Sequence, residues 1–142
     1  FNYGLLLGWT STQGFISVIP IIFYMGAIFW TLGYDTIYGF QDINDDEIIG
    51  VKSTSIKFKK NPKIFITTCY IITIISIILT GYLMNFNDLF FVFCVIPFFH
   101  LFFYQIKNLD ISKENICLRI FKSNNYFGLI IFFNILIGKI NF

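Results

Sequence analysis

Long stretches of apolar residues, separated by short polar segments, dominate this sequence. No charged side chain occurs in 1–34, 64–84, 89–106 or 123–138. A helix needs roughly 20 mostly apolar residues to cross the hydrocarbon core of a bilayer. Two of these stretches exceed that length, and the other two come close to it. The pattern therefore predicts several membrane-spanning helices joined by polar loops.

We expect five membrane helices and one helix that lies on the membrane surface. The membrane helices are predicted at about 1–13, 18–42, 62–84, 89–106 and 125–140, and the surface helix at 112–122. Pro97 lies inside its span and predicts a kink, because proline cannot donate the helical hydrogen bond. The surface helix is predicted because its apolar and charged residues fall mostly on opposite sides. The fold class expected is all-α, a polytopic transmembrane bundle with a single domain.

Composition agrees with a membrane setting. Apolar residues make up 56% of the chain and charged residues only 13%, whereas soluble domains carry about a quarter charged residues. So few charges could not cover the surface of a water-soluble globule. The chain begins with Phe1 and shows no signal-peptide pattern, which we interpret as numbering that starts inside a longer protein.

Basic residues are concentrated in two loops. Nine of the ten lysines and arginines fall within 43–63 and 107–122, while the short connection 85–88 has none. Cytoplasmic loops collect Lys and Arg. Since two predicted spans separate the two basic loops, both can lie on the cytoplasmic side, with 85–88 on the outside.

The segment 34–47 carries five of the eight acidic residues. If the preceding helix continues through it, Asp42 and Asp46 point within about 20° of the direction of Asp35. Oxygen ligands of this kind suit Mg²⁺, which completes its shell with water and substrate phosphates. Lys52 follows closely and could contact a diphosphate. The spacing alone is compatible with a Mg²⁺–diphosphate site and equally with a solvated acidic loop.

The sequence of this region resembles a known motif. Residues 34–58, YDTIYGFQDINDDEIIGVKSTSIKF, are similar to the second aspartate-rich motif of the UbiA superfamily of membrane prenyltransferases, and in particular to its 4-hydroxybenzoate branch. Gly8-Trp9, the Phe103-Tyr104-Gln105 run and the 124–129 run NNYFGL resemble the same branch. The resemblance covers nearly the whole chain.

The resemblance implies a fold of about nine membrane helices, of which this chain would supply the last five. It implies that Mg²⁺ binds to Asp42 and Asp46, with Asp45 contributing directly or through water. It implies that Lys52 contacts the diphosphate, with Asp35 and Tyr38 near the substrate. The residues that it assigns to catalysis are Asp42, Asp46 and Lys52.

The implied reaction is the Mg²⁺-dependent transfer of a polyprenyl group from polyprenyl diphosphate to the ring of 4-hydroxybenzoate, a step of ubiquinone biosynthesis. The family has a first aspartate-rich motif in its N-terminal half, and this sequence contains no such element. We therefore expect the chain to need that missing half and to be inactive alone. The expected location is the bacterial inner membrane, or alternatively the mitochondrial inner membrane, with no nucleic-acid partner.

Three other functions stay open from the sequence. One is a prenyltransferase of the same superfamily with another acceptor, and another is an inactive remnant. The third is a channel or transporter subunit with an acidic vestibule, which the clustering of charge at one membrane face disfavours. The lone His100 and the intramembrane Asn134 are expected to make hydrogen bonds between helices.

Overall fold

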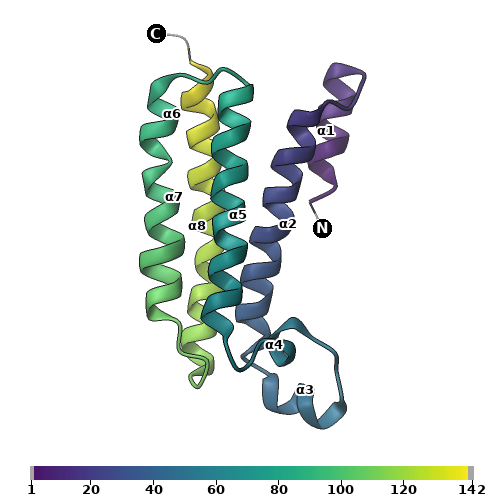
Figure 1. Ribbon diagram of the computed structural model, residues 1–142, viewed down its shortest axis with the longest axis vertical. Coiled ribbons are helices and arrows are strands. Elements are labelled where there is room, and N and C mark those ends of the chain that lie inside the picture. Colours follow the sequence, from purple (N-terminus) through teal and green to yellow (C-terminus); the bar gives the residue numbers. More distant parts are fainter. Residues whose placement is uncertain (1, 141–142) are drawn as a thin grey trace.

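Four helices that are long and apolar enough to cross a membrane run side by side in the structure (Figure 1). The structure is a computed structural model and describes residues 2–140. The four spans are α2 (Val18–Gly39), α5 (Pro62–Leu83), the segment Asp88–Ile106 and α8 (Glu114–Lys139). A shorter helix, α1 (Gly4–Gln13), packs beside α2. The described residues are otherwise helical or loop, which confirms the all-α bundle.

Local sequence explains where these helices begin and end. Pro62 is the first residue of α5, a position at which its missing N–H would have no helical partner anyway. Gly14 ends α1 with φ of 76°, a left-handed conformation that glycine adopts without strain. The side chain of Asn87 accepts a hydrogen bond from the Phe90 N–H, which caps the span beginning at Asp88. The amide of Asn87 also donates to the carbonyl of Ile137, which joins this turn to the end of α8.

The span 88–106 is not one regular helix. It consists of α6 (Asp88–Phe93), α7 (Val95–Phe99) and the π-helix η1 (His100–Ile106). Pro97 cannot donate to the carbonyl four residues earlier, and the regular α-helix is interrupted close to that carbonyl. The sequence located the disturbance at Pro97 but did not predict the π-helix.

The last two predicted helices are in fact one. The predictions of a surface helix at 112–122 and a separate span at 125–140 were wrong, because α8 runs unbroken from Glu114 to Lys139. Cys117 and Ile120 are fully buried in its first part. The apolar face of this segment therefore packs on the bundle.

Small residues allow α2 and α5 to pack closely. A Cβ added at Gly33 would overlap the ring of Tyr70, and one added at Gly26 would overlap Ser76. Thr73 donates a hydrogen bond to the carbonyl of Gly26 across the same contact. Close approach through small residues, with polar groups as links, is the usual way in which helices associate in lipid.

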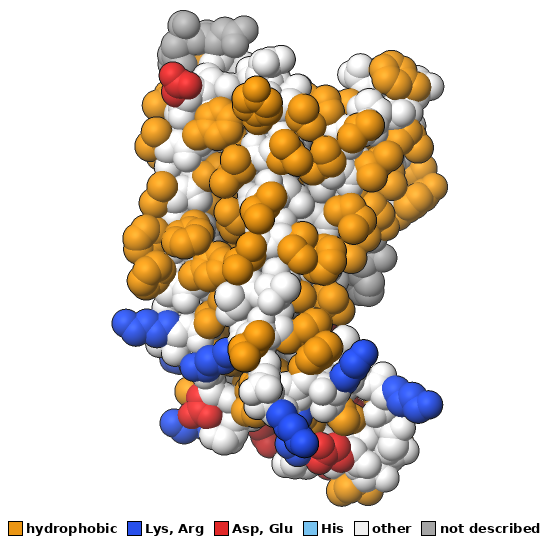
Figure 2. Space-filling view, viewed as in Figure 1, with side chains coloured by type: hydrophobic (Ala, Val, Ile, Leu, Met, Phe, Trp, Pro, Cys, Tyr) orange, Lys and Arg blue, Asp and Glu red, His pale blue; other side chains and the backbone are white. Residues whose placement is uncertain are grey.

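The two basic loops lie at one end of the bundle. The helices α3 (Ile43–Ile49) and α4 (Thr54–Lys57) are near the lower end of Figure 1, as is the turn between η1 and α8. The turn between α5 and α6 is at the other end. Figure 2 shows the Lys and Arg side chains gathered at the lower end. This confirms that the basic loops share one end, whereas its assignment to the cytoplasm stays a prediction.

Candidate active site

The helix that leads into the acidic segment ends earlier than predicted. The expected helix 18–42 stops at Gly39, and a separate helix α3 begins at Ile43. Phe40 and Ile43 are buried, so the chain turns inward between the two helices. A Cβ at Gly39 would also overlap the Ser55 hydroxyl, which indicates that the chain is tightly packed where α2 ends.

This break changes the geometry of the acidic residues. Asp35 lies on α2, Asp42 on the turn and Asp46 on α3, so the prediction that they line one face of a continuous helix was wrong. Asp35, Asp42 and Asp45 are exposed and Asp46 is half-buried. The assignment of these residues to a functional site does not depend on a shared helix and stays a prediction.

The helix α3 places its carboxylates favourably. Asp42 immediately precedes the helix, and its carbonyl accepts a hydrogen bond from the Asp46 N–H at 3.0 Å. Asp45 and Asp46 lie in the first turn, where the partial positive charge of the helix N-terminus stabilises anions. The helix ends at Gly50 with φ of 79°, and the chain then turns towards Lys52. The segment therefore gathers three carboxylates at the start of a short helix, of which those of Asp42 and Asp45 are exposed.

Hydrogen bonds hold the segment after Lys52 against α2. The buried Ser55 hydroxyl donates to the carbonyl of Thr36 at 2.9 Å, and the hydroxyls of Thr36 and Thr54 are 2.7 Å apart. Thr36 is the neighbour of Asp35, and Thr54 is two residues from the exposed Lys52. These bonds bring the lysine segment back to the turn of α2 that carries Asp35.

An ion pair also links the two short helices. The ammonium of Lys59 lies 2.9 Å from both carboxylate oxygens of Glu47. Both side chains are more than a third exposed, so water and salt weaken the interaction. Glu47 is therefore engaged at the surface and is the acidic residue of this segment least suited to bind a cation.

The described residues do not form a complete cation site. Among residues 2–140, no group of three or more His, Cys, Asp or Glu side chains lies close enough to hold a metal ion. The donor type nevertheless fits Mg²⁺, which binds proteins through one or two carboxylates and keeps other positions for water and phosphate. Asp42 and Asp46 could supply such ligands, and further ligands would have to come from elsewhere.

Aromatic contacts connect this region to α8. The ring of Tyr38 lies 4.6 Å from that of Phe121, and the ring of Tyr34 lies 5.7 Å from it. Tyr38 is exposed, as a residue near a substrate would need to be. Asp35 lines a separate shallow pocket with Asn2 and Thr31. Tyr38 and Asp35 thus lie on neighbouring sides of α2.

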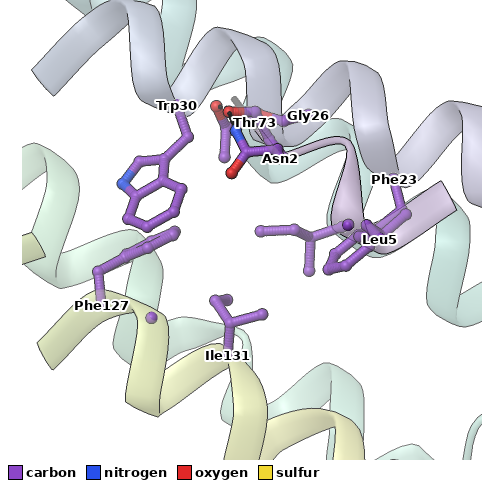
Figure 3. A pocket seen from close by; sticks show the side chains of 12 residues that line it. Asn2, Leu5, Phe23, Gly26, Trp30, Thr73, Phe127 and Ile131 are labelled. Atoms are coloured by element: carbon purple, nitrogen blue, oxygen red, sulfur yellow. Dashed lines mark hydrogen bonds between the residues drawn. The ribbon is translucent and has the colours of Figure 1, made fainter. Parts of the chain in front are cut away.

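An apolar cavity of about 290 Å³ lies deeper in the bundle, between α1, α2, α5 and α8. Figure 3 shows Trp30 and Phe127 at one side of it and Leu5 and Phe23 at the other. A second cavity of about 350 Å³ shares Leu5, Phe23 and Ile77 with the first and extends to Lys139. Together they make an apolar passage along the bundle, reaching towards the end opposite the acidic segment.

A buried polar cluster lies beside this passage. The Trp30 indole donates to the Asn124 side-chain oxygen at 2.8 Å, and the Gln105 amide donates to the same oxygen at 3.1 Å. The Tyr70 hydroxyl donates to Gln105 at 2.5 Å. In the sequence, Gln105 and Asn124 stand out only as parts of runs that resemble a known family. The meeting of four helices at these two residues was not predicted. A glutamine and an asparagine inside apolar spans could have indicated a buried hydrogen-bonded cluster between helices.

The two intramembrane polar residues expected to link helices do so. His100 and the Ser123 hydroxyl are 3.3 Å apart and connect η1 to α8. The Asn134 amide lies 3.3 Å from the Cys94 sulfur, which connects α8 to the junction of α6 and α7. Both observations confirm the sequence prediction.

Comparisons with known proteins give a consistent result. The UbiA prenyltransferase family matches residues 1–136. The chain is 40% identical to 4-hydroxybenzoate geranyltransferase 2 of Lithospermum erythrorhizon, over 98% of this chain and 45% of that protein. It is 37% identical to the mitochondrial 4-hydroxybenzoate polyprenyltransferase of Arabidopsis thaliana, over 97% of this chain and 34% of that protein. The enzyme of the same name from Drosophila melanogaster is 34% identical, over 99% and 36%.

These relatives are longer than the chain, which spans less than half of their length. No solved structure shows a significant similarity to it. The match over nearly all of its residues shows that the chain belongs to the UbiA prenyltransferase family.

Proposed function

We propose that the chain is the C-terminal part of a membrane enzyme that transfers a polyprenyl group from polyprenyl diphosphate to the ring of 4-hydroxybenzoate. The observation that carries the proposal is the similarity, over almost the entire chain, to relatives named for prenyl transfer to this acceptor. Exposed carboxylates and Lys52 at one end of an apolar bundle support it, because the substrate joins a charged diphosphate to a long hydrocarbon tail.

Within this proposal, the chain's own residues bind and orient the diphosphate. Asp42 and Asp46 offer carboxylate oxygens to Mg²⁺, and Asp45 contributes charge beside them. Bound Mg²⁺ would neutralise the diphosphate oxygens and make the diphosphate a better leaving group. Lys52 adds a positive charge on the substrate side, held near α2 by the Ser55 and Thr54 contacts. Asp35 and Tyr38 complete the substrate-facing residues.

The apolar passage suits the remainder of the donor substrate. Its walls are aromatic and aliphatic side chains, with few polar atoms, as expected of a space that receives hydrocarbon. The acceptor ring must reach the end of the tail that carries the diphosphate. We therefore place the reaction near the end of the bundle at which the acidic segment lies.

The proposal includes dependence on the missing half. Among the described residues, no three His, Cys, Asp or Glu side chains lie close enough together to hold a metal ion. The family's first aspartate-rich motif does not occur in this sequence. We expect the chain expressed by itself to be inactive. The proposed location is an inner membrane, either bacterial or mitochondrial, and the Arabidopsis and Drosophila relatives are named mitochondrial.

The test is prenyl transfer in membranes that contain the full-length protein. Activity with polyprenyl diphosphate and 4-hydroxybenzoate is measured across a Mg²⁺ titration for wild type, Asp42→Ala and Asp46→Ala. Loss of one well-placed electrostatic group lowers the rate by roughly 10²–10³. Asp88→Ala is the matched control, because Asp88 is exposed at the opposite end of the bundle. Near wild-type activity in both site variants would refute the site.

A panel of acceptor substrates tests whether the enzyme prefers 4-hydroxybenzoate or an acceptor used elsewhere in the superfamily. We expect transfer to 4-hydroxybenzoate and little transfer to a naphthoate, to homogentisate or to haem. Faster transfer to one of these other acceptors would keep the family assignment and overturn the proposed acceptor.

A further inference from the structure

The outer face of α8 carries a groove that the catalytic proposal does not use. Cys117, Ile120 and Phe127 point from α8 into the bundle. The groove lies on another side of the helix, where η1 and α8 adjoin. Its α8 residues include Asn115, Leu118, Arg119, Lys122, Tyr126 and Leu129. The residue that contacts Tyr38, Phe121, is not among them, so the groove is separate from the acidic segment.

One end of this groove is basic. A cavity of about 800 Å³ opens there between η1 and α8, and Arg119 and Lys122 line it together with Tyr104. In the part of the chain that the structure describes, no acidic side chain lines the cavity. Within residues 2–140, neither Arg119 nor Lys122 forms an ion pair, as is true of most basic side chains there, but these two cations lie one turn apart on α8 and line one cavity. Two neighbouring cations without an acidic partner favour an anion from outside the described chain.

The other end of the groove is apolar. A cavity of about 340 Å³ continues from the basic one and shares Tyr126 and Leu129 with it. Its remaining lining is almost entirely hydrocarbon, from Phe93 and Ile96 on one side to Ile130 and Phe133 on the other. The groove thus passes from a basic to an apolar lining along the direction in which α8 crosses the membrane.

This arrangement matches the shape and charge of one class of molecule. The basic end lies at the same end of the bundle as the Lys- and Arg-rich loops, where the polar headgroups of a bilayer would be (Figure 2). Basic pockets between membrane helices on that side bind anionic headgroups. The apolar end lies at the depth of the acyl chains. We propose that this groove binds an anionic phospholipid of the surrounding bilayer.

In this complex the phosphate lies between Arg119 and Lys122. Asn115 and Tyr104 also line the cavity and carry groups that can donate hydrogen bonds. One acyl chain follows Leu129 and Ile130 towards the middle of the membrane. A free phosphate ion would use only the basic end, and a prenyl diphosphate would use both ends. The experiment therefore has an arm for each of these molecules.

The first arm measures lipid binding. The full-length protein is placed in nanodiscs that contain phosphatidylcholine with a small fraction of phosphatidylglycerol, and the bound lipid is counted by native mass spectrometry. The Arg119→Gln/Lys122→Gln double variant should retain roughly tenfold less phosphatidylglycerol than wild type. The control is Lys57→Gln/Lys60→Gln, which removes the same charge from the other basic loop. Equal retention in both double variants would overturn the proposal.

The second arm tests the apolar end. Ile130→Trp fills the groove beyond the basic cavity and should lower phosphatidylglycerol retention while Arg119 and Lys122 remain. Inorganic phosphate at millimolar concentration should not displace the lipid, because it lacks the tail. Displacement by phosphate alone, or unchanged retention in Ile130→Trp, would overturn the proposed acyl-chain contact.

The third arm addresses other occupants. Arg119→Cys should react with a water-soluble maleimide in membranes that lack anionic lipid and react more slowly when phosphatidylglycerol is present. No reaction under either condition would mean that another part of the protein covers the groove, which overturns the proposal. Displacement of phosphatidylglycerol by polyprenyl diphosphate would instead identify the groove as a substrate site. That result would also overturn the proposal of a phospholipid site.

Discussion

The two polar regions of the bundle differ in how their side chains are satisfied. At the end that carries α3, the aspartates and Lys52 are mostly exposed and are held in place through their neighbours' hydroxyls and backbone. In the middle, Gln105 and Asn124 are buried and bond to each other and to two more helices. Among the described residues, the first region leaves most of its charged groups exposed apart from the Glu47–Lys59 pair, whereas the second pairs its polar groups within the protein.

The difference follows from the surroundings of each region. A polar group buried in an apolar bundle is costly unless it is hydrogen-bonded, so a buried amide persists where it joins helices. Charged groups at the membrane edge keep their water and can exchange it for a ligand. Substitutions should therefore reduce activity at the exposed end and stability in the middle, and each prediction below tests that separation.

The largest effect is expected from the exposed carboxylates. Asp46→Asn keeps the shape of the side chain and the first turn of α3 but removes the charge, and should lower the prenyl transfer rate by roughly 10²–10³. The unfolding temperature in detergent should change little, because Asp46 is only half-buried. A large drop in that temperature would mean that Asp46 supports the fold, and the two regions would no longer differ.

The next largest effect is expected from the buried cluster. Asn124→Leu removes the acceptor for the Trp30 indole and the Gln105 amide and should destabilise the protein by about 1–2 kcal/mol, measured by thermal or denaturant unfolding in detergent. Activity per folded molecule should fall far less than in Asp46→Asn. The control is Asn125→Leu, whose side chain is exposed. An equal loss of stability in the control would contradict the cluster's role.

A mixed effect is expected where the two regions are joined. Ser55→Ala removes the hydrogen bond to the Thr36 carbonyl and should lower stability by roughly 1 kcal/mol. It should also raise the KM for the diphosphate several-fold, because it loosens the segment that bears Lys52. Ser112→Ala, in the exposed turn before α8, serves as the comparison. If only stability changed, Ser55 would belong to the structural region alone.

The smallest effect is expected from the surface ion pair. Glu47→Gln should lower stability by about 0.2–1 kcal/mol, and the difference should shrink at high salt because both partners are exposed. Unfolding measured at low and high ionic strength gives both values. A loss that is larger and independent of salt would show that Glu47 is held in a drier environment than its exposure indicates.

Much of the fold follows from apolar runs and helix-ending residues. The predicted starts of α2 and α5 agree with the structure to the residue, because Pro62 and the polar turn before Val18 mark them clearly. Local sequence does not show which partner a residue will contact. Gly39 gave no strong signal that α2 would end there, since the close approach of Ser55 involves a residue sixteen positions away.

The first part of α8 was mispredicted for a related reason. The apolar and charged residues of 112–122 fall mostly on opposite sides, as in a surface helix, yet Cys117 and Ile120 face the bundle and the helix continues to Lys139. The acidic segment was found from the clustering of five acidic residues within 34–47 and from the family resemblance. Its angular arrangement was wrong because an ideal helix was assumed through Asp42, where the backbone in fact leaves the helical region.

The π-helix at His100–Ile106 has a consequence for how this protein tolerates changes in length. Its hydrogen bonds reach one residue further than those of an α-helix, so it holds about one residue more than an α-helical turn would. Deletion of Phe103 should therefore let the segment relax into ordinary α-helix while the residues on either side keep their orientation towards α8. Related sequences that lack one residue here should keep the same packing of the span, and alignments across it should allow a one-residue gap.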